Sequence, residues 1–122
     1  MTDWAVEYDG FSYTAGSGNG RWSTTGWIMP NGAGSTTKRV FKFTAPKAGT
    51  LKVESSATGD SEQTGRFVTV NFGGVETSKE GGAPASGDHS LNEYEISDAG
   101  DVYIYVTGSG GLRFYAFHYK SN

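Results

Sequence analysis

The chain contains no cysteine, only two histidines and three prolines, and no long apolar run. Without thiols, neither a disulfide nor a thiolate metal site can form. No stretch approaches the roughly 20 apolar residues that a transmembrane helix needs, so we expect no membrane partner. The formal net charge is only −3 and no charge run is present, which argues against binding to nucleic acid.

A targeting segment is also missing from the start of the chain. Met1 is followed by Thr-Asp-Trp rather than by a basic segment and an apolar core, so no signal peptide is visible. The length of 122 residues allows one domain with a real core, and we expect a single domain over residues 1–122. The chain is either a cytosolic protein or, as its even texture favours, an extracellular module cut from a larger secreted protein.

Glycine is abundant, with 19 residues, and the apolar positions are mostly β-branched or aromatic. No window keeps a helical period, because glycine or proline interrupts each candidate. Residues 11–34 are expected to be largely irregular, and residues 58–65 and 79–90 are expected to form loops. Strands are expected at residues 4–8, 26–29, 38–45, 50–57, 66–72, 75–77, 91–97, 101–107 and 112–120, with a bulge in residues 91–97.

Two segments of the chain echo each other. Residues 41–53 (FKFTAPKAGTLKV) and residues 94–104 (YEISDAGDVYI) each place a short turn ending in Ala-Gly between two strands. We interpret each as a hairpin, one in each sheet, and we expect residues 101–120 to form a further hairpin. The fold class predicted is all-β: a jelly-roll-like β-sandwich of two antiparallel sheets with about eight to nine short strands.

The terminal hairpin is expected to carry aromatic side chains on its outer face. Alternation along its strands directs Val102, Ile104, Leu112, Phe114, Ala116 and His118 inward, and Tyr103, Tyr105, Arg113, Tyr115 and Phe117 outward. Tyrosine rings stack on the faces of pyranose sugars, and an arginine fork can bind a carboxylate. The alternative is that the preceding segment with Trp22 and Trp27 folds over this face and covers it.

Basic residues form the second candidate surface. If residues 38–57 form a hairpin, parity brings Lys42 and Lys52 together on its outer face. Arg66 and Lys79 would add contacts for an acidic polymer. The alternative is a surface ion-pair cluster with Glu54, which would contribute little energy.

Catalysis has little support in the sequence, and we expect the protein not to be an enzyme. His89 lies in a loop-like stretch and His118 in the last strand, without a recognisable triad. Glu93 and Glu95 share a strand face, but their spacing does not define a glycosidase pair. We expect no cofactor, although acidic pairs at residues 7 and 9, 60 and 62, and 98 and 101 leave a structural calcium open.

Residues 41–58 (FKFTAPKAGTLKVESSAT), followed by residues 65–70 (GRFVTV), resemble the small β-sandwich carbohydrate-binding modules of bacterial secreted glycan-degrading enzymes. The resemblance is strongest to the pectin-binding modules attached to pectate lyases, and it covers roughly residues 38–119. It extends to residues 103–105 (YIY), 108–111 (GSGG) and 112–119 (LRFYAFHY). This resemblance implies that basic side chains on one sheet surface bind polygalacturonate, with Lys42, Lys52, Arg66 and Arg113 as candidates.

These observations together predict a non-catalytic carbohydrate-binding module that targets a linked catalytic domain to plant cell-wall polysaccharide, as a monomer. The favoured ligand is acidic pectin, homogalacturonan, bound through the ligand-binding candidates Lys42, Lys52, Arg66, Lys79, Tyr103, Tyr105, Arg113 and Tyr115. Two alternatives remain. One is a neutral β-glucan or xylan ligand bound by tryptophan and tyrosine. The other is a structural or adhesion sandwich whose aromatic face contacts another protein.

Overall fold

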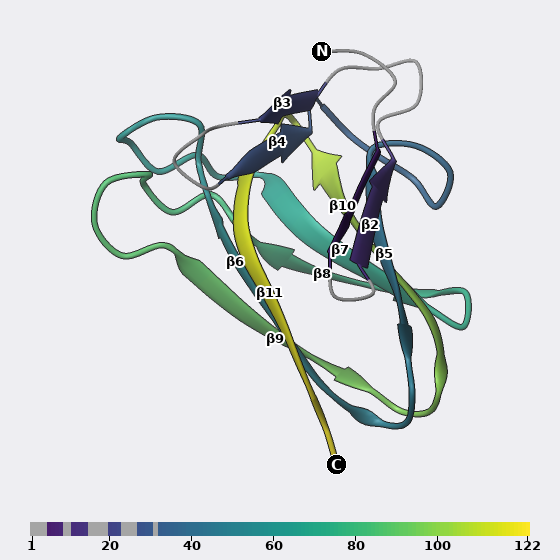
Figure 1. The fold of residues 1–122 in the computed structure, drawn as a ribbon. Coiled ribbons are helices and arrows are strands. Elements are labelled where there is room, and N and C mark those ends of the chain that lie inside the picture. Colours follow the sequence, from purple (N-terminus) through teal and green to yellow (C-terminus); the bar gives the residue numbers. More distant parts are fainter. Residues whose placement is uncertain (1–4, 9–10, 15–19, 23–26, 31) are drawn as a thin grey trace.

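The computed structural model of the protein describes residues 5–8, 11–14, 20–22, 27–30 and 32–122 (Figure 1). Within these ranges the chain forms strands and no helix, and therefore no helix that could cross a membrane. The strands are β1 (Ala5–Tyr8), β2 (Phe11–Thr14), β3 (Gly20–Trp22), β4 (Ile28–Pro30), β5 (Val40–Ala45), β6 (Gly49–Ser56), β7 (Arg66–Phe72), β8 (Val75–Glu80), β9 (Ser90–Ile96), β10 (Gly100–Gly108) and β11 (Arg113–Ser121).

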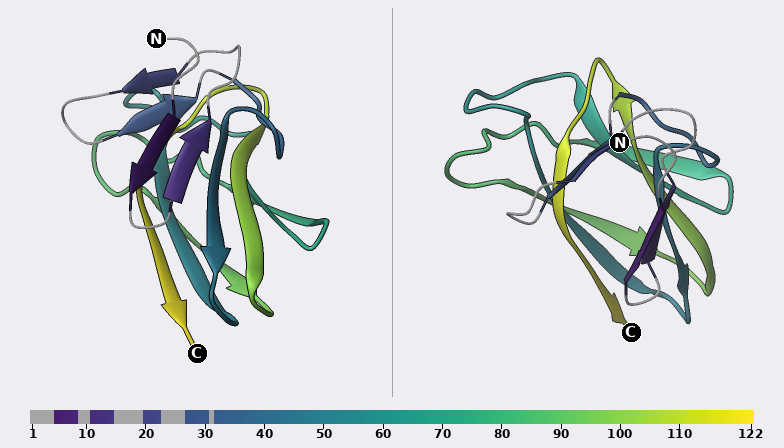
Figure 2. Two further views of the ribbon diagram at one scale, coloured as in Figure 1. Left: turned by 45° about the vertical axis from the view of Figure 1, so that its right-hand side comes forward. Right: turned by 45° about the horizontal axis from the view of Figure 1, so that its top comes forward.

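The strands build two antiparallel sheets that face each other as a β-sandwich (Figures 1 and 2). Sheet I has the strand order β1-β2-β5-β10-β7-β8, and sheet II has the order β3-β4-β11-β6-β9. From β4 to β11 the strands pair as β4 with β11, β5 with β10, β6 with β9 and β7 with β8, and successive pairs alternate between the sheets. This winding defines a jelly roll.

The predicted all-β jelly-roll sandwich is therefore confirmed. The described residues contain more strands than the eight or nine expected, because β2 lies in sheet I between β5 and β1, the strand expected at residues 4–8, and β3 extends one edge of sheet II. These additions fall in residues 11–34, which were expected to be largely irregular. Residues 15–19 and 23–26 of that region lie outside the described ranges.

The predicted hairpins at residues 38–57, 94–104 and 101–120 are all wrong, and β9 and β10, which the second would join, lie in opposite sheets. β5 lies in sheet I and β6 in sheet II, and β10 and β11 are likewise in opposite sheets. Residues 46–48 and 97–99 therefore join strands of facing sheets, as arches over one end of the core. The echo between these segments marks two neighbouring arches, because β5 pairs with β10 and β6 with β9. The hairpin of β7 and β8 is confirmed, with Gly73 and Gly74 at positive φ in its turn.

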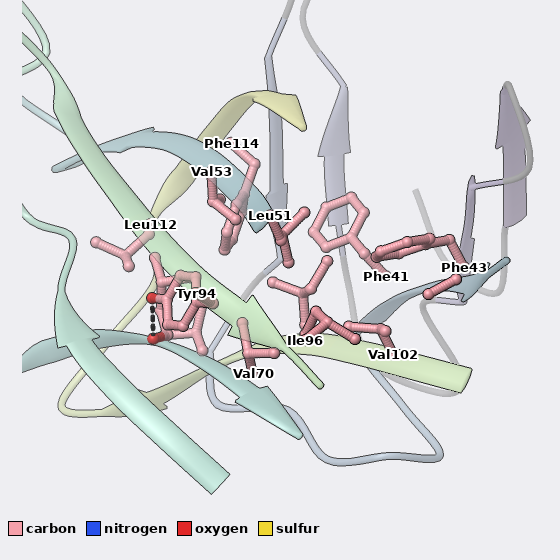
Figure 3. Packing of buried hydrophobic residues seen from close by; sticks show 14 residues of the cluster. Phe41, Phe43, Leu51, Val53, Val70, Tyr94, Ile96, Val102, Leu112 and Phe114 are labelled. Atoms are coloured by element: carbon pink, nitrogen blue, oxygen red, sulfur yellow. Dashed lines mark hydrogen bonds between the residues drawn. The ribbon is translucent and has the colours of Figure 1, made fainter. Parts of the chain in front are cut away.

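The core fills the space between the sheets (Figure 3). Its inward residues alternate along the strands as predicted, with Phe41 and Phe43 from β5 facing Leu51 and Val53 from β6. Each fully buried aliphatic or aromatic side chain contributes about 1.5–3 kcal/mol through removal from water. The other buried members are Ala45, Val68, Val70, Tyr94, Ile96, Val102, Ile104, Val106, Leu112 and Phe114. The Tyr94 hydroxyl is satisfied inside this core, because it donates to the Val68 carbonyl at 2.7 Å.

A β-bulge reverses the alternation of β11 halfway along the strand. The pairing of β11 with β6 shifts register between Phe114 and Ala116. Beyond this shift Phe117 packs against the core, 4.7 Å from the ring of Phe41, whereas Ala116 and His118 are exposed. The predicted orientations of Ala116, Phe117 and His118 are all wrong, since one extra residue exchanges the two faces of a strand.

The bulge predicted in residues 91–97 is also wrong. β9 pairs with β6 without interruption from Ser90 to Ile96. Tyr94 and Ile96 face the core, and Leu91 points outward with 72% of its surface exposed. The broken alternation in this strand comes from an exposed leucine and needs no extra residue.

Candidate functional site

The predicted pair of basic residues does not form, because the hairpin that would create it does not exist. Lys42 lies on the outer face of sheet I, with its Nζ 3.6 Å from a carboxylate oxygen of Asp101. Lys52 lies on the outer face of sheet II, with its Nζ 3.3 Å from a carboxylate oxygen of Glu93. The two ammonium groups are on opposite sides of the sandwich, and each is neutralised by a local partner.

Arg66 and Lys79 make contacts that hold the framework together. Arg66 donates from Nη1 to the carbonyl of Gly111 at 2.9 Å, and so joins the start of β7 to the connection before β11. Lys79 is exposed on the edge strand β8, on the face of that strand that is turned toward sheet II. Its Nζ lies 5.1 Å from the centre of the Tyr94 ring. Both side chains contact the protein itself, and Lys79 shares a partner with Lys52, because Lys79 donates to the Glu93 carbonyl and Lys52 pairs with the Glu93 carboxylate.

The tyrosines of β10 lie on the outer face of sheet I. Tyr105 is only 3% exposed, and its hydroxyl donates to the Glu76 carboxylate and accepts from the Asn71 amide at 3.3 Å. Burial, and then the hydrogen bond with Glu76, raise the pKa of Tyr105. Gly34 packs directly over its Cβ, which agrees in part with the alternative that an upstream segment covers these rings. Tyr105 is therefore inaccessible to a stacking ligand.

Tyr103 keeps part of its surface exposed between Lys42 and Asn71, its neighbours across the strands. The Lys42 ammonium lies 5.6 Å from the centre of its ring. Glu76 and Asp101 on the same face are acidic, so Lys42 is balanced by carboxylates rather than joined by further cations. In the part of it that the structure describes, this face offers the partly exposed rings of Tyr103 and Phe67 and no excess of positive charge.

Arg113 has a different environment, on the outer face of sheet II. Its guanidinium carbon lies 4.4 Å from the centre of the Trp27 ring, a distance typical of a cation–π stack. Ile28 of β4 pairs with Phe114 of β11 in an antiparallel register, so Trp27 and Arg113 are diagonal neighbours across the two strands, a separation that long side chains can bridge. The Arg113 Nε is buried without a hydrogen-bond partner in the described part of the chain, and no described carboxylate forms an ion pair with this guanidinium.

Tyr115 lies next along β11, at the bulge. Its hydroxyl is 2.8 Å from the hydroxyl of Ser56, the residue that pairs with Arg113 in the register of β6 and β11. The ring of His89 stacks on Tyr115, with centroids 4.1 Å apart and an angle of 16° between the planes. Trp27, Arg113, Tyr115 and His89 are all partly exposed, and together they are called the Arg113 patch.

The Arg113 patch combines the two kinds of group that an acidic sugar requires. Indole and phenol rings provide apolar faces that stack on pyranose rings. The guanidinium supplies a planar fork that binds a carboxylate through two parallel hydrogen bonds. Among the described arginines, Arg39 and Arg66 donate to backbone carbonyls, so Arg113 differs from both in lacking a described acceptor.

The aromatic residues and the arginine that were expected on one outer face are thus divided among three environments. Tyr103 and Tyr105 belong to sheet I, Arg113 and Tyr115 belong to sheet II, and Phe117 is packed against the core. From the sequence, His89 was assigned to no binding site, and Trp27 was expected in a covering segment or, with the other tryptophans, in the alternative neutral-glycan site. Both residues reach β11 from distant parts of the chain, and only the pairing of β4 with β11 could have indicated the position of Trp27.

The acidic residues do not gather into a metal site within the described residues, where no three histidine, aspartate or glutamate side chains converge. Asp98 accepts the amide hydrogen of Ala99 at 2.8 Å, and Asp101 accepts the hydroxyl of Thr44 at 2.8 Å. Asp60 and Glu62 are exposed. Asp9 and the side chain of residue 7 lie outside the described set.

The carboxylates of β9 are held by neighbouring strands. Glu93 pairs with Lys52, and Glu95 accepts a hydrogen bond from the hydroxyl of Thr50 at 3.0 Å. Both carboxylates lie on the exposed outer face of sheet II, the shared strand face that was expected for them.

Comparison with known proteins adds no assignment to this geometry. No model of a protein family matches the chain, and no curated protein sequence matches it significantly.

Proposed function

We propose that the protein is a non-catalytic carbohydrate-binding module that binds acidic plant cell-wall polysaccharide, such as homogalacturonan, at the Arg113 patch. The observation that carries this proposal is the partly exposed side chain of Arg113, whose guanidinium is stacked on Trp27 and whose buried Nε has no described acceptor. A guanidinium that is oriented by an aromatic ring can bind a carboxylate through its terminal Nη groups. Tyr115 adds a second ring on the same strand.

The sugar would use the patch through two contacts. A pyranose ring would stack on an exposed edge or face of Trp27 or Tyr115, where apolar area is removed from water. Its carboxylate would accept hydrogen bonds from Arg113. Because Lys42 and Lys52 already have carboxylate partners, affinity would come from this local site rather than from a wide basic surface.

The biological setting of the proposal comes from the resemblance of residues 38–119 to modules of secreted glycan-degrading enzymes. In such an enzyme, a covalently linked catalytic domain is kept at a high effective concentration beside its insoluble substrate. The module would act outside the cell as a monomer, with polysaccharide as its ligand and without a nucleic-acid or membrane partner.

Native electrophoresis in gels containing polygalacturonate tests the proposal. We expect retardation of the wild-type protein that weakens as salt rises, and Arg113→Ala should reduce the affinity about tenfold to hundredfold, as loss of a charge-assisted hydrogen bond does. Lys42→Ala is the control, because it removes the same charge from the opposite face of the sandwich. Equal losses in the two variants would show a general charge effect and overturn the site.

Other outcomes separate the alternatives. Retardation by xylan or β-glucan that is abolished by Trp27→Ala and retained in Arg113→Ala would identify a neutral ligand. A protein that is retarded by no glycan and forms oligomers as its concentration rises would instead be a structural or adhesion sandwich.

A further inference from the structure

His89 belongs to the Arg113 patch, and both of its ring nitrogens lie within hydrogen-bonding distance of another residue. Its Nδ1 lies 2.6 Å from a carboxylate oxygen of Glu54, and its Nε2 lies 2.9 Å from the carbonyl oxygen of Ala85. Both partners are acceptors only. A neutral imidazole has a single N–H and could satisfy only one of them, whereas an imidazolium donates to both.

The two hydrogen bonds and the stack join three elements. Glu54 belongs to β6, Ala85 to the loop of residues 81–89, and Tyr115 to the bulge of β11. Elsewhere this loop is attached by backbone hydrogen bonds from Ala57 to Ala83 and from Ala85 to Gly59. Loss of the His89 contacts would therefore leave the loop anchored and would release the imidazole ring from its position on Tyr115.

We infer that His89 is a positioning residue for the Arg113 patch: as an imidazolium bonded to Glu54 and the Ala85 carbonyl, it fixes the Tyr115 ring, and it loses that hold on deprotonation. The neutral ring can keep its N–H toward Glu54, but its other nitrogen then directs a lone pair at the Ala85 carbonyl oxygen. That repulsion breaks one of the two contacts. The consequence for glycan binding rests on the proposed function, whereas the protonation state of His89 does not.

The charged groups that face His89 all favour the protonated form. Glu54 from β6 supplies the largest effect, through its hydrogen bond to the ring, and Asp88 in the loop adds a smaller Coulombic attraction. Tyr115 presents the face of its ring from β11, which suits a stacked cation. Against these, burial disfavours the charge, but the net effect is that the pKa of His89 is raised above the usual 6.5.

Long-range nitrogen–proton NMR of the imidazoles tests this inference directly. We expect both ring nitrogens of His89 to give protonated-type signals at about pH 7, where an ordinary imidazole is mostly neutral. His118, the other histidine of the chain, provides a reference signal in the same spectra. An unprotonated-type nitrogen in His89 at this pH would overturn the inference.

The variant Glu54→Gln tests whether Glu54 stabilises the protonated form of His89. Glu54→Gln keeps an oxygen acceptor but removes the charge, so the titration midpoint of His89 should fall by at least about half a pH unit. The ring signals of Tyr115 should follow the same midpoint in the wild type. A His89 midpoint that is unchanged in Glu54→Gln, or Tyr115 signals that do not follow it, would refute the positioning role.

Glycan binding is then measured against pH as a separate readout. We expect retardation of the wild type by polygalacturonate to weaken as the pH rises through the His89 midpoint. This pH dependence should be absent in His89→Gln. If no glycan retards the protein while both His89 nitrogens are protonated, the proposed function fails and the assignment of the imidazolium stands. If retardation occurs but is equally pH-dependent in His89→Gln, the role of His89 in the site is refuted.

Discussion

Lys79 and Asn92 hydrogen-bond to each other's strands across the open side of the sandwich. Lys79 of β8 donates from Nζ to the carbonyl of Glu93 in β9 at 2.5 Å, and Asn92 of β9 donates from Nδ2 to the carbonyl of Glu80 in β8 at 2.9 Å. β8 and β9 are edge strands of opposite sheets. These bonds occupy edge carbonyls that a second chain could otherwise pair with, and they close the seam between the sheets.

The seam gives a prediction about stability. Lys79→Met keeps the aliphatic stem near Tyr94 but removes the donor, and it should lower the free energy of unfolding by about 0.5–1.5 kcal/mol. Urea denaturation measures this loss, and Lys120→Met, at an exposed position of β11, is the control. Lys79 was also a ligand candidate. Because it is not part of the Arg113 patch, its replacement should leave glycan retardation unchanged. If Lys79→Met instead abolished glycan retardation without lowering the stability, Lys79 would be a ligand-binding residue.

Gly34 gives a second prediction, because a side chain there has no room. A Cβ at this position would lie 2.4 Å from the carbonyl oxygen of Arg39 and 2.9 Å from the Cβ of Tyr105. Gly34→Ala should therefore destabilise the protein by about 1–3 kcal/mol in thermal or urea unfolding. Gly59→Ala is the control, since nothing lies within 4 Å of its Cβ position, and its effect should stay within about 0.5 kcal/mol. Equal effects in the two variants would contradict the packing of residues 32–39 on Tyr105.

The pair of His89 and Glu54 predicts how stability depends on pH. The pKa of His89 is raised in the folded protein by its hydrogen bond to Glu54, so the stabilising contribution is fully present below the ordinary value of 6.5. It is lost as the pH rises through the raised value, because the folded state then gives up the extra proton. The difference in melting temperature between wild type and His89→Gln should shrink over that range. A difference that is constant or grows with pH would show that the imidazole acts without its charge.

Much of the fold follows from local patterns in the sequence. Alternation in residues 40–45, 49–56 and 66–72 indicates which side chains enter the core, because a strand with one buried face must repeat every second residue. The jelly-roll class follows from many short strands separated by glycine-containing turns. The connectivity between the sheets does not, because a connection as short as residues 46–48 can close a hairpin or an arch with the same turn residues.

That ambiguity decided the outcome for the candidate site. As a hairpin, residues 38–57 would bring Lys42 beside Lys52, whereas the arch sends them to opposite faces. The Arg113–Trp27 stack was not predictable from the same local patterns, because the two residues are far apart in the sequence and meet only through pairing of β4 with β11. Arg113 was found as a candidate, but its neighbours depend on topology.

The bulge in β11 allows the two registers to be compared by experiment. With the uninterrupted alternation predicted from sequence, Phe117 would be exposed and Ala116 buried, whereas the structure packs Phe117 against Phe41 and exposes Ala116. Phe117→Ala should therefore cost about 2–4 kcal/mol of unfolding free energy, somewhat less than a fully buried phenylalanine because the side chain is only partly buried.

Ala116→Lys provides the reciprocal test of the same bulge. At an exposed position this substitution should change the unfolding free energy by no more than about 0.5 kcal/mol, while a lysine forced into the core without a partner would cost several. Urea denaturation of both variants distinguishes the registers. A severe loss in Ala116→Lys together with a mild one in Phe117→Ala would restore the uninterrupted strand, and it would also remove Tyr115 from its position between Ser56 and His89.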